Sequence, residues 1–323
     1  MRGIIIIALL VFNQLASPGA RAECPPPSGE PMDKAALASS RPPAYEPQTV
    51  IDAFTAMGFM CSAFDSRKGI TCKAKAGVVP GYSEEVAIII PAHFVPSQRA
   101  HLFTHIHGNN TVGASFDGFM QKYKFEDILA DSGRNSIMII PFSHSTTTVL
   151  NHHDLQDAKL FRMFMDSVTG TIQKAKLAQY ATPAAIAISG HSGAFNPIAQ
   201  ILEQPCPDIP EPCYSRLVNE VHLLDATYGP YTDRFARFAA REPASRLTVR
   251  SCNGGETIAG AKALLKATRA NLPPGSPAPQ LLPADATDAA FAATNPAIML
   301  TNTNHMNIAQ TYLPAVLSDQ GAP

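Results

Sequence analysis

Short apolar segments recur along most of the chain and alternate with segments whose apolar residues have a helical spacing. The short segments are nearly continuous and rich in Val, Ile and Leu, as are strands that are buried on both faces of a parallel sheet. We predict strands at 86–90, 102–106, 137–140, 184–189, 218–224, 247–250 and 297–300.

Between the later strands, apolar residues recur every three or four positions, which is typical of one buried helix face. The clearest such pattern runs over 155–179, and further helices are predicted at 197–202, 233–241, 256–270 and 306–317. Strands that alternate with helices predict an α/β fold with a mostly parallel central sheet and helices on both faces. The Ala- and Pro-rich segment 271–295 is expected to be a loop, either a wall of a substrate site or a solvated excursion.

The first residues of the chain follow a different pattern. Met1-Arg2 precedes an apolar run at 4–12 and small residues ending at Ala22, which is typical of a secretory signal peptide. The run is shorter than the roughly 20 residues that a transmembrane helix needs. We therefore expect a periplasmic or secreted protein without a stable membrane anchor, with a signal peptide at 1–22, a Pro-rich arm at 23–49 and a single α/β domain at 50–323.

Six cysteines follow the predicted signal peptide, and an even number in an oxidising compartment indicates disulfides. If 57–64 and 69–76 form a hairpin, Cys61 and Cys72 lie directly opposite one another, at a separation that suits a bridge.

The other cysteines are less constrained by their positions. Cys206 and Cys213 flank a Pro-rich loop that a local bridge would close, whereas Cys24 and Cys252 form a pair by elimination only. Because no Cys-x-x-Cys spacing occurs, we expect no metal site.

The charge of the chain is balanced, with 25 basic and 26 acidic residues and a net charge of −1. Such a chain offers no electrostatic basis for binding nucleic acid or an anionic membrane surface. The expected partner is therefore a small-molecule or acylated substrate, and the oligomeric state is left open.

Candidate chemistry begins where the apolar strand at 184–189 runs into Gly190-His191-Ser192-Gly193-Ala194. A strand, a glycine-flanked serine and a helix-compatible segment form the context of a nucleophile elbow, here with Ala194 in place of the last glycine. We predict that Ser192 is a nucleophile. The alternative is an ordinary strand-to-helix turn.

A second motif follows the strand at 102–106, in the sequence His107-Gly108-Asn109-Asn110. Acyl transfer needs backbone N–H groups that stabilise an oxyanion. The N–H groups of Gly193 and Asn109 are the predicted donors, with the N–H or side chain of Asn110 as a further option. The alternative is a polar turn.

Together these motifs resemble the α/β-hydrolase superfamily, from about Glu84 to Leu317, and no subfamily is assigned. The resemblance implies the chain order serine, acid, histidine. Only His222 and His305 follow the serine; His222 lies inside a strand and is expected to be an edge or core histidine, whereas His305 follows the last strand and is the predicted base.

The acid has two candidates. Asp225 directly follows the buried strand at 218–224, where a carboxylate without a role would be costly. Glu256 lies one strand later, where many members of the superfamily have their acid, although it can also simply begin a helix. Asp225 is the preferred acid and Glu256 the alternative.

The resemblance therefore implies an exported serine hydrolase that cleaves a carboxylic ester through an acyl-enzyme, without a cofactor. Two alternatives remain open. The same triad serves a peptidase or amidase, and a hydrolase scaffold can also belong to a non-catalytic binding protein.

Overall fold

The fold is built on a twisted central sheet of ten strands in the order β1-β2-β3-β5-β4-β6-β7-β8-β10-β9. The strands β1, β2, β3 and β5 pair antiparallel in series, and every pair from β5–β4 to β10–β9 is parallel. Their bounds are β1 Met60–Cys61, β2 Ile70–Ala74, β3 Val86–Ile90, β4 His101–Ile106, β5 Ile137–Pro141, β6 Ala185–His191, β7 Val218–Leu224, β8 Arg246–Cys252, β9 Gln280–Leu282 and β10 Ala297–Thr301.

This computed structural model describes residues 43–318 except for 111, 207–211, 242–244, 253–254, 277, 288–289 and 292. The chain divides into two units, Met1–Glu30 and Pro31–Pro323, and all described residues belong to the second. The predicted signal peptide lies outside the described residues. Helix α1 (Pro47–Ala56) begins within the range expected for the N-terminal arm, and Tyr45 before it is buried.

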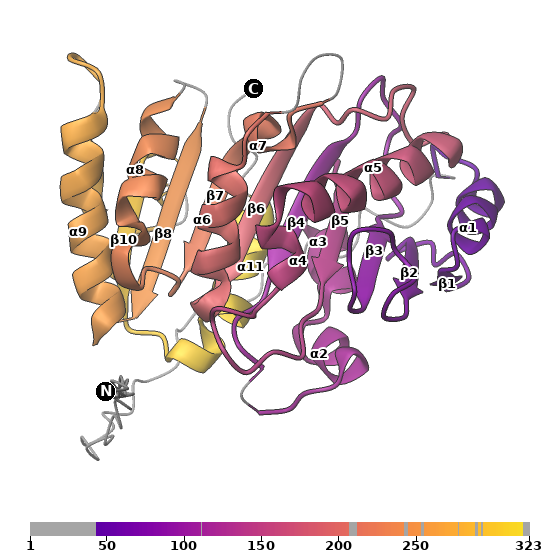
Figure 1. Ribbon diagram of the computed structural model, residues 1–323, viewed down its shortest axis with the longest axis horizontal. Helices are drawn as coiled ribbons and strands as arrows, with labels where there is room; N and C mark the ends of the chain where they lie inside the picture. The colour runs from indigo at the N-terminus through magenta and orange to yellow at the C-terminus, as the bar shows by residue number, and fades with distance from the viewer. Residues whose placement is uncertain are drawn as a thin grey trace, which may run out of the picture. The chain divides into compact units, whose positions relative to one another are not determined.

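Helices cover both faces of the sheet (Figure 1). One face carries α1, α5, α6, α8 and α9, and the other carries α2, α3 and α11. Besides α1, the bounds are α2 Phe116–Tyr123, α3 Phe125–Ser132, α4 His153–Gln156, α5 Ala158–Lys174, α6 Phe195–Glu203, α7 Tyr214–Leu217, α8 Thr232–Arg241, α9 Glu256–Asn271 and α11 Ile308–Ser318.

Strand β3 illustrates why the apolar runs form this sheet. Successive side chains of a strand point to opposite faces. Accordingly, Ile88 and Ile90 pack into the core beneath α5 and α6, whereas Ala87 and Ile89 pack into the core beneath α3 and α11. A strand with a core on each side must be apolar at every position, so its sequence is a continuous apolar run rather than an alternating one.

Two elements that the apolar pattern left unassigned are helices α2 and α3. The Ser115 side chain caps α2 by accepting a hydrogen bond from the Gly118 N–H. Aromatic residues then bury both helices against the sheet, with Phe119 and Phe125 in ring contact at 5.3 Å.

Two other segments differ from the expected boundaries. The long helix expected at 155–179 is divided into α4 and α5, because the Asp157 side chain accepts hydrogen bonds from the N–H groups of Lys159 and Leu160 and starts a new helix. The loop expected at 271–295 contains β9, which extends the sheet beside β10. Phe291, from the same segment, is buried.

Two of the three expected disulfides are formed. Cys61 and Cys72 are opposite one another in the β1–β2 pair and are bonded, as the hairpin predicted. Cys206 and Cys213 are also bonded. The third pair, inferred by elimination, is wrong in this structure, because Cys252 has a free thiol; Cys24 lies outside the described residues. No helix among the described residues is long and apolar enough to cross a membrane.

Candidate active site

Ser192 stands in a sharp turn between strand β6 and helix α6. Its φ of 54° lies in the left-handed region, which non-glycine residues rarely occupy. Glycine is favoured two residues before it, because a Cβ at Gly190 would lie 2.3 Å from Ile198 Cδ1 and 2.9 Å from Ala194 Cβ. Ala194, at the place of the motif's last glycine, is fully buried and is accommodated against Gly190. The strained backbone projects the serine from the carboxyl edge of the sheet.

The structure brings Ser192, His305 and Asp225 together from three separate elements. His305 Nε2 lies 3.0 Å from Ser192 Oγ, and His305 Nδ1 lies 2.5 Å from Asp225 Oδ2. An ionised carboxylate only accepts hydrogen bonds, so the Nδ1 atom carries the imidazole proton and Nε2 is free to accept one. We call the hydrogen-bonded series from Asp225 through His305 to Ser192 the relay. The Asp225 side chain is 3% exposed and the His305 side chain 34%, so the relay runs from the interior to an accessible face.

Asp225 follows β7 and is held from several sides. Its N–H donates to the Arg250 carbonyl at 2.7 Å, and its Oδ1 accepts from the Cys252 N–H at 3.0 Å. Burial by itself would raise the pKa of Asp225, but hydrogen bonds from His305, Thr257 and Cys252 outweigh it and lower that pKa. The Asp225 carboxylate is therefore ionised and fixed toward the imidazole.

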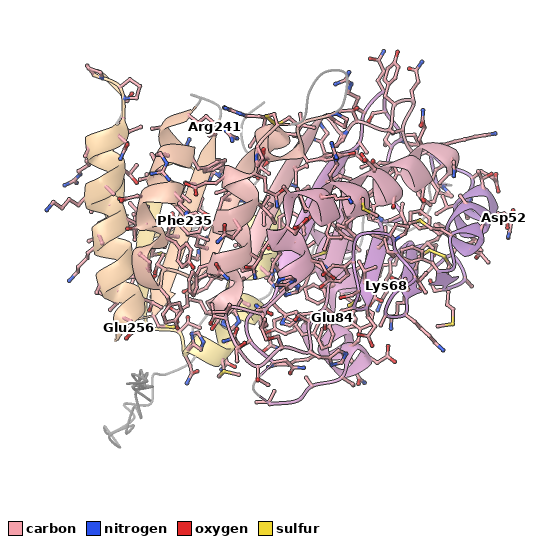
Figure 2. All side chains as sticks on the ribbon, viewed as in Figure 1. Asp52, Lys68, Glu84, Phe235, Arg241 and Glu256 are labelled. Atoms are coloured by element: carbon pink, nitrogen blue, oxygen red, sulfur yellow. A yellow bond between two sulfur atoms is a disulfide. The ribbon has the colours of Figure 1, made fainter. Side chains whose placement is uncertain are left out.

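Glu256, the alternative acid, lies elsewhere. It begins helix α9, its side chain is exposed, and Figure 2 shows it at the lower end of that helix. Among the described residues, the carboxylate that contacts the His305 imidazole is that of Asp225.

The residue before the serine, His191, holds the loop that carries His305. Its Nε2 donates a hydrogen bond to the His305 carbonyl at 2.9 Å, and the two rings lie 4.8 Å apart. Burial, together with repulsion from His305, lowers the pKa of His191 to about 4, so the ring is neutral. The sequence analysis missed this contact, because residues 191 and 305 are far apart in the chain.

The loop after β4 is fixed by the ring and carbonyl of His107. The ring donates from Nδ1 to the Gly108 carbonyl and accepts the Ser143 N–H at Nε2, over 2.5 and 2.8 Å. The His107 carbonyl in turn accepts hydrogen bonds from Asn151 Nδ2 and His152 Nε2. Burial lowers the pKa of His107 to about 4, so the ring is neutral at neutral pH, and its hydrogen bonds select the tautomer.

This network places Asn109 against the serine turn. A Cβ at Gly193 would lie 2.3 Å from Asn109 Oδ1 and 3.3 Å from the Asn109 nitrogen. Gly193 lies in the first turn of the helical segment that begins at Ser192, where N–H groups have no carbonyl partner within the helix itself. The predicted donors, the Gly193 and Asn109 N–H groups, thus lie in adjoining backbone segments. The Asn110 N–H and side chain are engaged by Ser145 and Ala114.

Tyr228 forms part of the wall beside the histidine. Its ring stands edge-on to His305, with centroids 6.5 Å apart, and is tilted against Phe195 at 5.6 Å. Burial, followed by the nearby Asp225 carboxylate, raises the pKa of Tyr228 to about 12, although a hydrogen bond with Ser192 opposes the shift. The hydroxyl therefore stays protonated at neutral pH, at the edge of the site.

Comparison with known proteins adds neighbours in structure only. No family model matches the chain, and no curated protein matches its sequence. A mutant of the feruloyl esterase module from Clostridium thermocellum, complexed with sinapinate, is 12% identical with a TM-score of 0.46 over 77% of this chain and 87% of that chain.

Two structures of an esterase from Thermogutta terrifontis are also similar. Esterase 2 phosphorylated by paraoxon is 12% identical with a TM-score of 0.45, over 81% of this chain and 92% of that chain. Its apo form is 14% identical with a TM-score of 0.44, over 73% and 87% of the two chains. The parallel sheet with helices on both faces, the strand–turn–helix at Ser192 and the histidine after β10 are those of the α/β-hydrolase fold, which is the fold of this chain.

Proposed function

We propose that this protein is a serine hydrolase that cleaves a carboxylic ester through an acyl-enzyme. The observation that carries the proposal is the continuous hydrogen-bonded relay from Asp225 through His305 to Ser192. A serine hydroxyl is a weak nucleophile until a neighbouring base removes its proton, and the relay supplies that base in the required orientation.

In the first step, Ser192 Oγ attacks the carbonyl carbon of the ester while His305 Nε2 takes its proton. The imidazolium that forms is stabilised by the Asp225 carboxylate on its other side. The developing oxyanion accepts hydrogen bonds from the Gly193 and Asn109 N–H groups, and collapse of the intermediate expels the alcohol, which takes the proton from His305.

In the second step, a water molecule replaces the alcohol. His305 removes a proton from that water, which attacks the acyl carbon. The bond between the acyl carbon and Ser192 Oγ then breaks, His305 returns the proton to Ser192 Oγ, and the acid product leaves. An ester makes the smaller demand on this site, because an alkoxide leaves far more readily than the amide anion that an unprotonated amide would expel.

The compartment is part of the proposal. The pattern of residues 1–22 is that of an export signal, and two disulfides at Cys61–Cys72 and Cys206–Cys213 suit an oxidising environment. We propose a periplasmic or secreted enzyme that acts on a small-molecule or acylated substrate.

Covalent labelling tests the proposed nucleophile. A fluorophosphonate probe is expected to label the wild-type protein and to fail with Ser192→Ala, which keeps the fold. Ser145→Ala is the matched control, because the Ser145 hydroxyl bonds within its own loop, and it should be labelled as wild type. Wild-type protein that resists the probe would leave a non-catalytic binding protein as the better description.

A substrate panel tests the bond. We expect p-nitrophenyl esters to be hydrolysed with a burst of p-nitrophenol if deacylation is slow, and peptidyl anilides to be cleaved far more slowly. A higher kcat/KM for the anilides would replace the esterase by a peptidase or amidase with the same triad.

A further inference from the structure

Three side chains that commonly ligate metal ions, including the His305 imidazole itself, meet on the Nδ1 side of that imidazole. Asp225, Cys252 and His305 each present a ligand atom, and these atoms all lie within 4.8 Å of one another. The spacing of cysteines along the sequence predicted no metal site. The three residues meet because strands β7, β8 and β10, which they end or follow, all finish at the same edge of the sheet.

The scaffold of this cluster is rigid on two sides. Strand β8 lies between β7 and β10, so Asp225 and Cys252 stand at the ends of neighbouring parallel strands. The Cys252 N–H donates to Asp225 Oδ1 at 3.0 Å, and Cys252 pairs with Thr301 at the end of β10. The positions of the thiol and the carboxylate are therefore set by the sheet ladder.

The third side chain can adjust. His305 lies in a single helical turn after β10, and its side chain is 34% exposed. Zinc ligands lie about 2.0–2.3 Å from the ion, so a nitrogen and an oxygen bound to one ion stand roughly 3 Å apart or more. The imidazole must therefore move outward from its 2.5 Å contact with Asp225, toward the side that solvent reaches.

We propose that Asp225, Cys252 and His305 Nδ1 bind a thiophilic divalent cation, with Zn²⁺ the best match, and that this cation inhibits the relay reversibly. A thiolate, an imidazole and a carboxylate are a usual donor set for zinc, with water as the fourth ligand of a tetrahedral site. The inhibition rests on the proposed function; the binding site does not.

The protons balance as follows. Cys252 loses its S–H proton to solvent when the sulfur binds the ion, and Asp225 is already ionised. The ion takes the place of the Nδ1 proton of His305, and the neutral imidazole carries its proton on Nε2 instead. Binding releases one proton in total. An Nε2 that bears a proton cannot accept the one from Ser192, so the nucleophile stays inactive.

Cobalt tests the site without reference to activity. Co²⁺ added to the metal-free wild-type protein should produce the near-ultraviolet absorption band of a thiolate–cobalt bond, and added Zn²⁺ should abolish it. Cys252→Ser, which keeps a hydrogen-bond donor beside Asp225, should lack the band. Cys24→Ser should keep it, which separates the contribution of Cys252 from that of Cys24.

Inhibition of ester hydrolysis is the second measurement. Zn²⁺ should inhibit the wild-type protein, EDTA should restore its activity, and Cys252→Ser should raise the inhibitory concentration by about tenfold or more, as loss of a metal ligand does. Each variant is compared with its own zinc-free rate. Glu256→Gln, a nearby carboxylate outside the cluster, should be inhibited as wild type.

Two outcomes overturn the proposal. One is a wild-type protein that gives no thiolate–cobalt band, including the case in which thiol titration finds Cys252 bonded to Cys24. The other is a band or an inhibition that persists unchanged in Cys252→Ser. A cobalt band at Cys252 in a protein that hydrolyses no ester would refute the proposed function and leave the metal site standing.

Discussion

Two carboxylate–histidine pairs involve strand β7: Glu220 and His222 lie within the strand, whereas Asp225 directly follows it and meets His305 from the turn after β10. Glu220 Oε2 lies 3.2 Å from His222 Nε2, and Asp225 Oδ2 lies 2.5 Å from His305 Nδ1. Both carboxylates are buried, and both have a lowered pKa, that of Glu220 reaching about 2. The carboxylate–histidine contact alone therefore does not distinguish a catalytic group from a structural one.

The two pairs differ in what stands on their other sides. His222 is 0% exposed and its second nitrogen contacts Thr248 Oγ1, while Glu220 is also paired with Arg134 at 2.6 Å. Both nitrogens of His222 and both carboxylate oxygens of Glu220 therefore contact other protein groups, and we call this the closed pair. His305 is partly exposed, and its second nitrogen meets a serine hydroxyl in a strained turn. A pair becomes a candidate relay when one end remains open to a nucleophile and to substrate.

The largest expected effect is on the activity that depends on the open pair, Asp225 and His305. Asp225→Asn should lower kcat by about 10⁴-fold, because the amide favours the wrong tautomer of His305. Ester hydrolysis by purified protein measures this. Glu256→Gln is the matched control and should leave kcat unchanged; a greater loss for Glu256→Gln would make Glu256 the acid.

The closed pair should respond in stability instead. Glu220→Gln removes the carboxylate partner of Arg134, whose side chain is 9% exposed, and should lower the free energy of unfolding by about 3–5 kcal/mol. Urea denaturation measures the change. The kcat of the folded fraction should be unaffected, and a selective loss of kcat at full stability would contradict a structural role.

The predicted oxyanion donors beside the open pair should make kcat sensitive to a methyl group added at Gly193. In Gly193→Ala the new Cβ would collide with Asn109, so the two donor segments should separate and kcat should fall by roughly 10²–10³-fold. Gly170→Ala, inside α5 with no atom within 4 Å of the added Cβ, should keep wild-type activity. Equal kcat values for the two variants would remove Gly193 from the site.

The smallest expected effect concerns pH. Burial lowers the pKa of His191 to about 4, against about 6.5 in the unfolded chain, so between these values the unfolded state binds more protons. Stability should therefore fall as the pH drops from about 6.5 to 4, by up to about 1.4 kcal/mol per pH unit for this group. His191→Gln should reduce that slope in urea titrations; an unchanged slope would mean that His191 is protonated in the folded protein.

Much of the sheet could be predicted, because a strand between two cores needs an apolar residue at every position, as in β3. Helix α2 also carried a usable signal, since Phe116, Phe119, Met120 and Tyr123 follow helical spacing after the capping Ser115. Strand β9 did not, because two of its three side chains are exposed and its place depends on pairing with β10.

The local features of this protein could be read from neighbouring residues and the geometry of single elements: apolar strands, amphipathic helices, the cysteine pair of one hairpin and a glycine-flanked serine after a strand. Three contacts emerged only in the folded domain. Asp225 is the carboxylate that meets His305, His191 holds the loop of His305, and Cys252 stands free beside Asp225. These contacts join strand ends that the order of the sheet brings together, and sheet order depends on packing across the whole domain rather than on spacing along the chain.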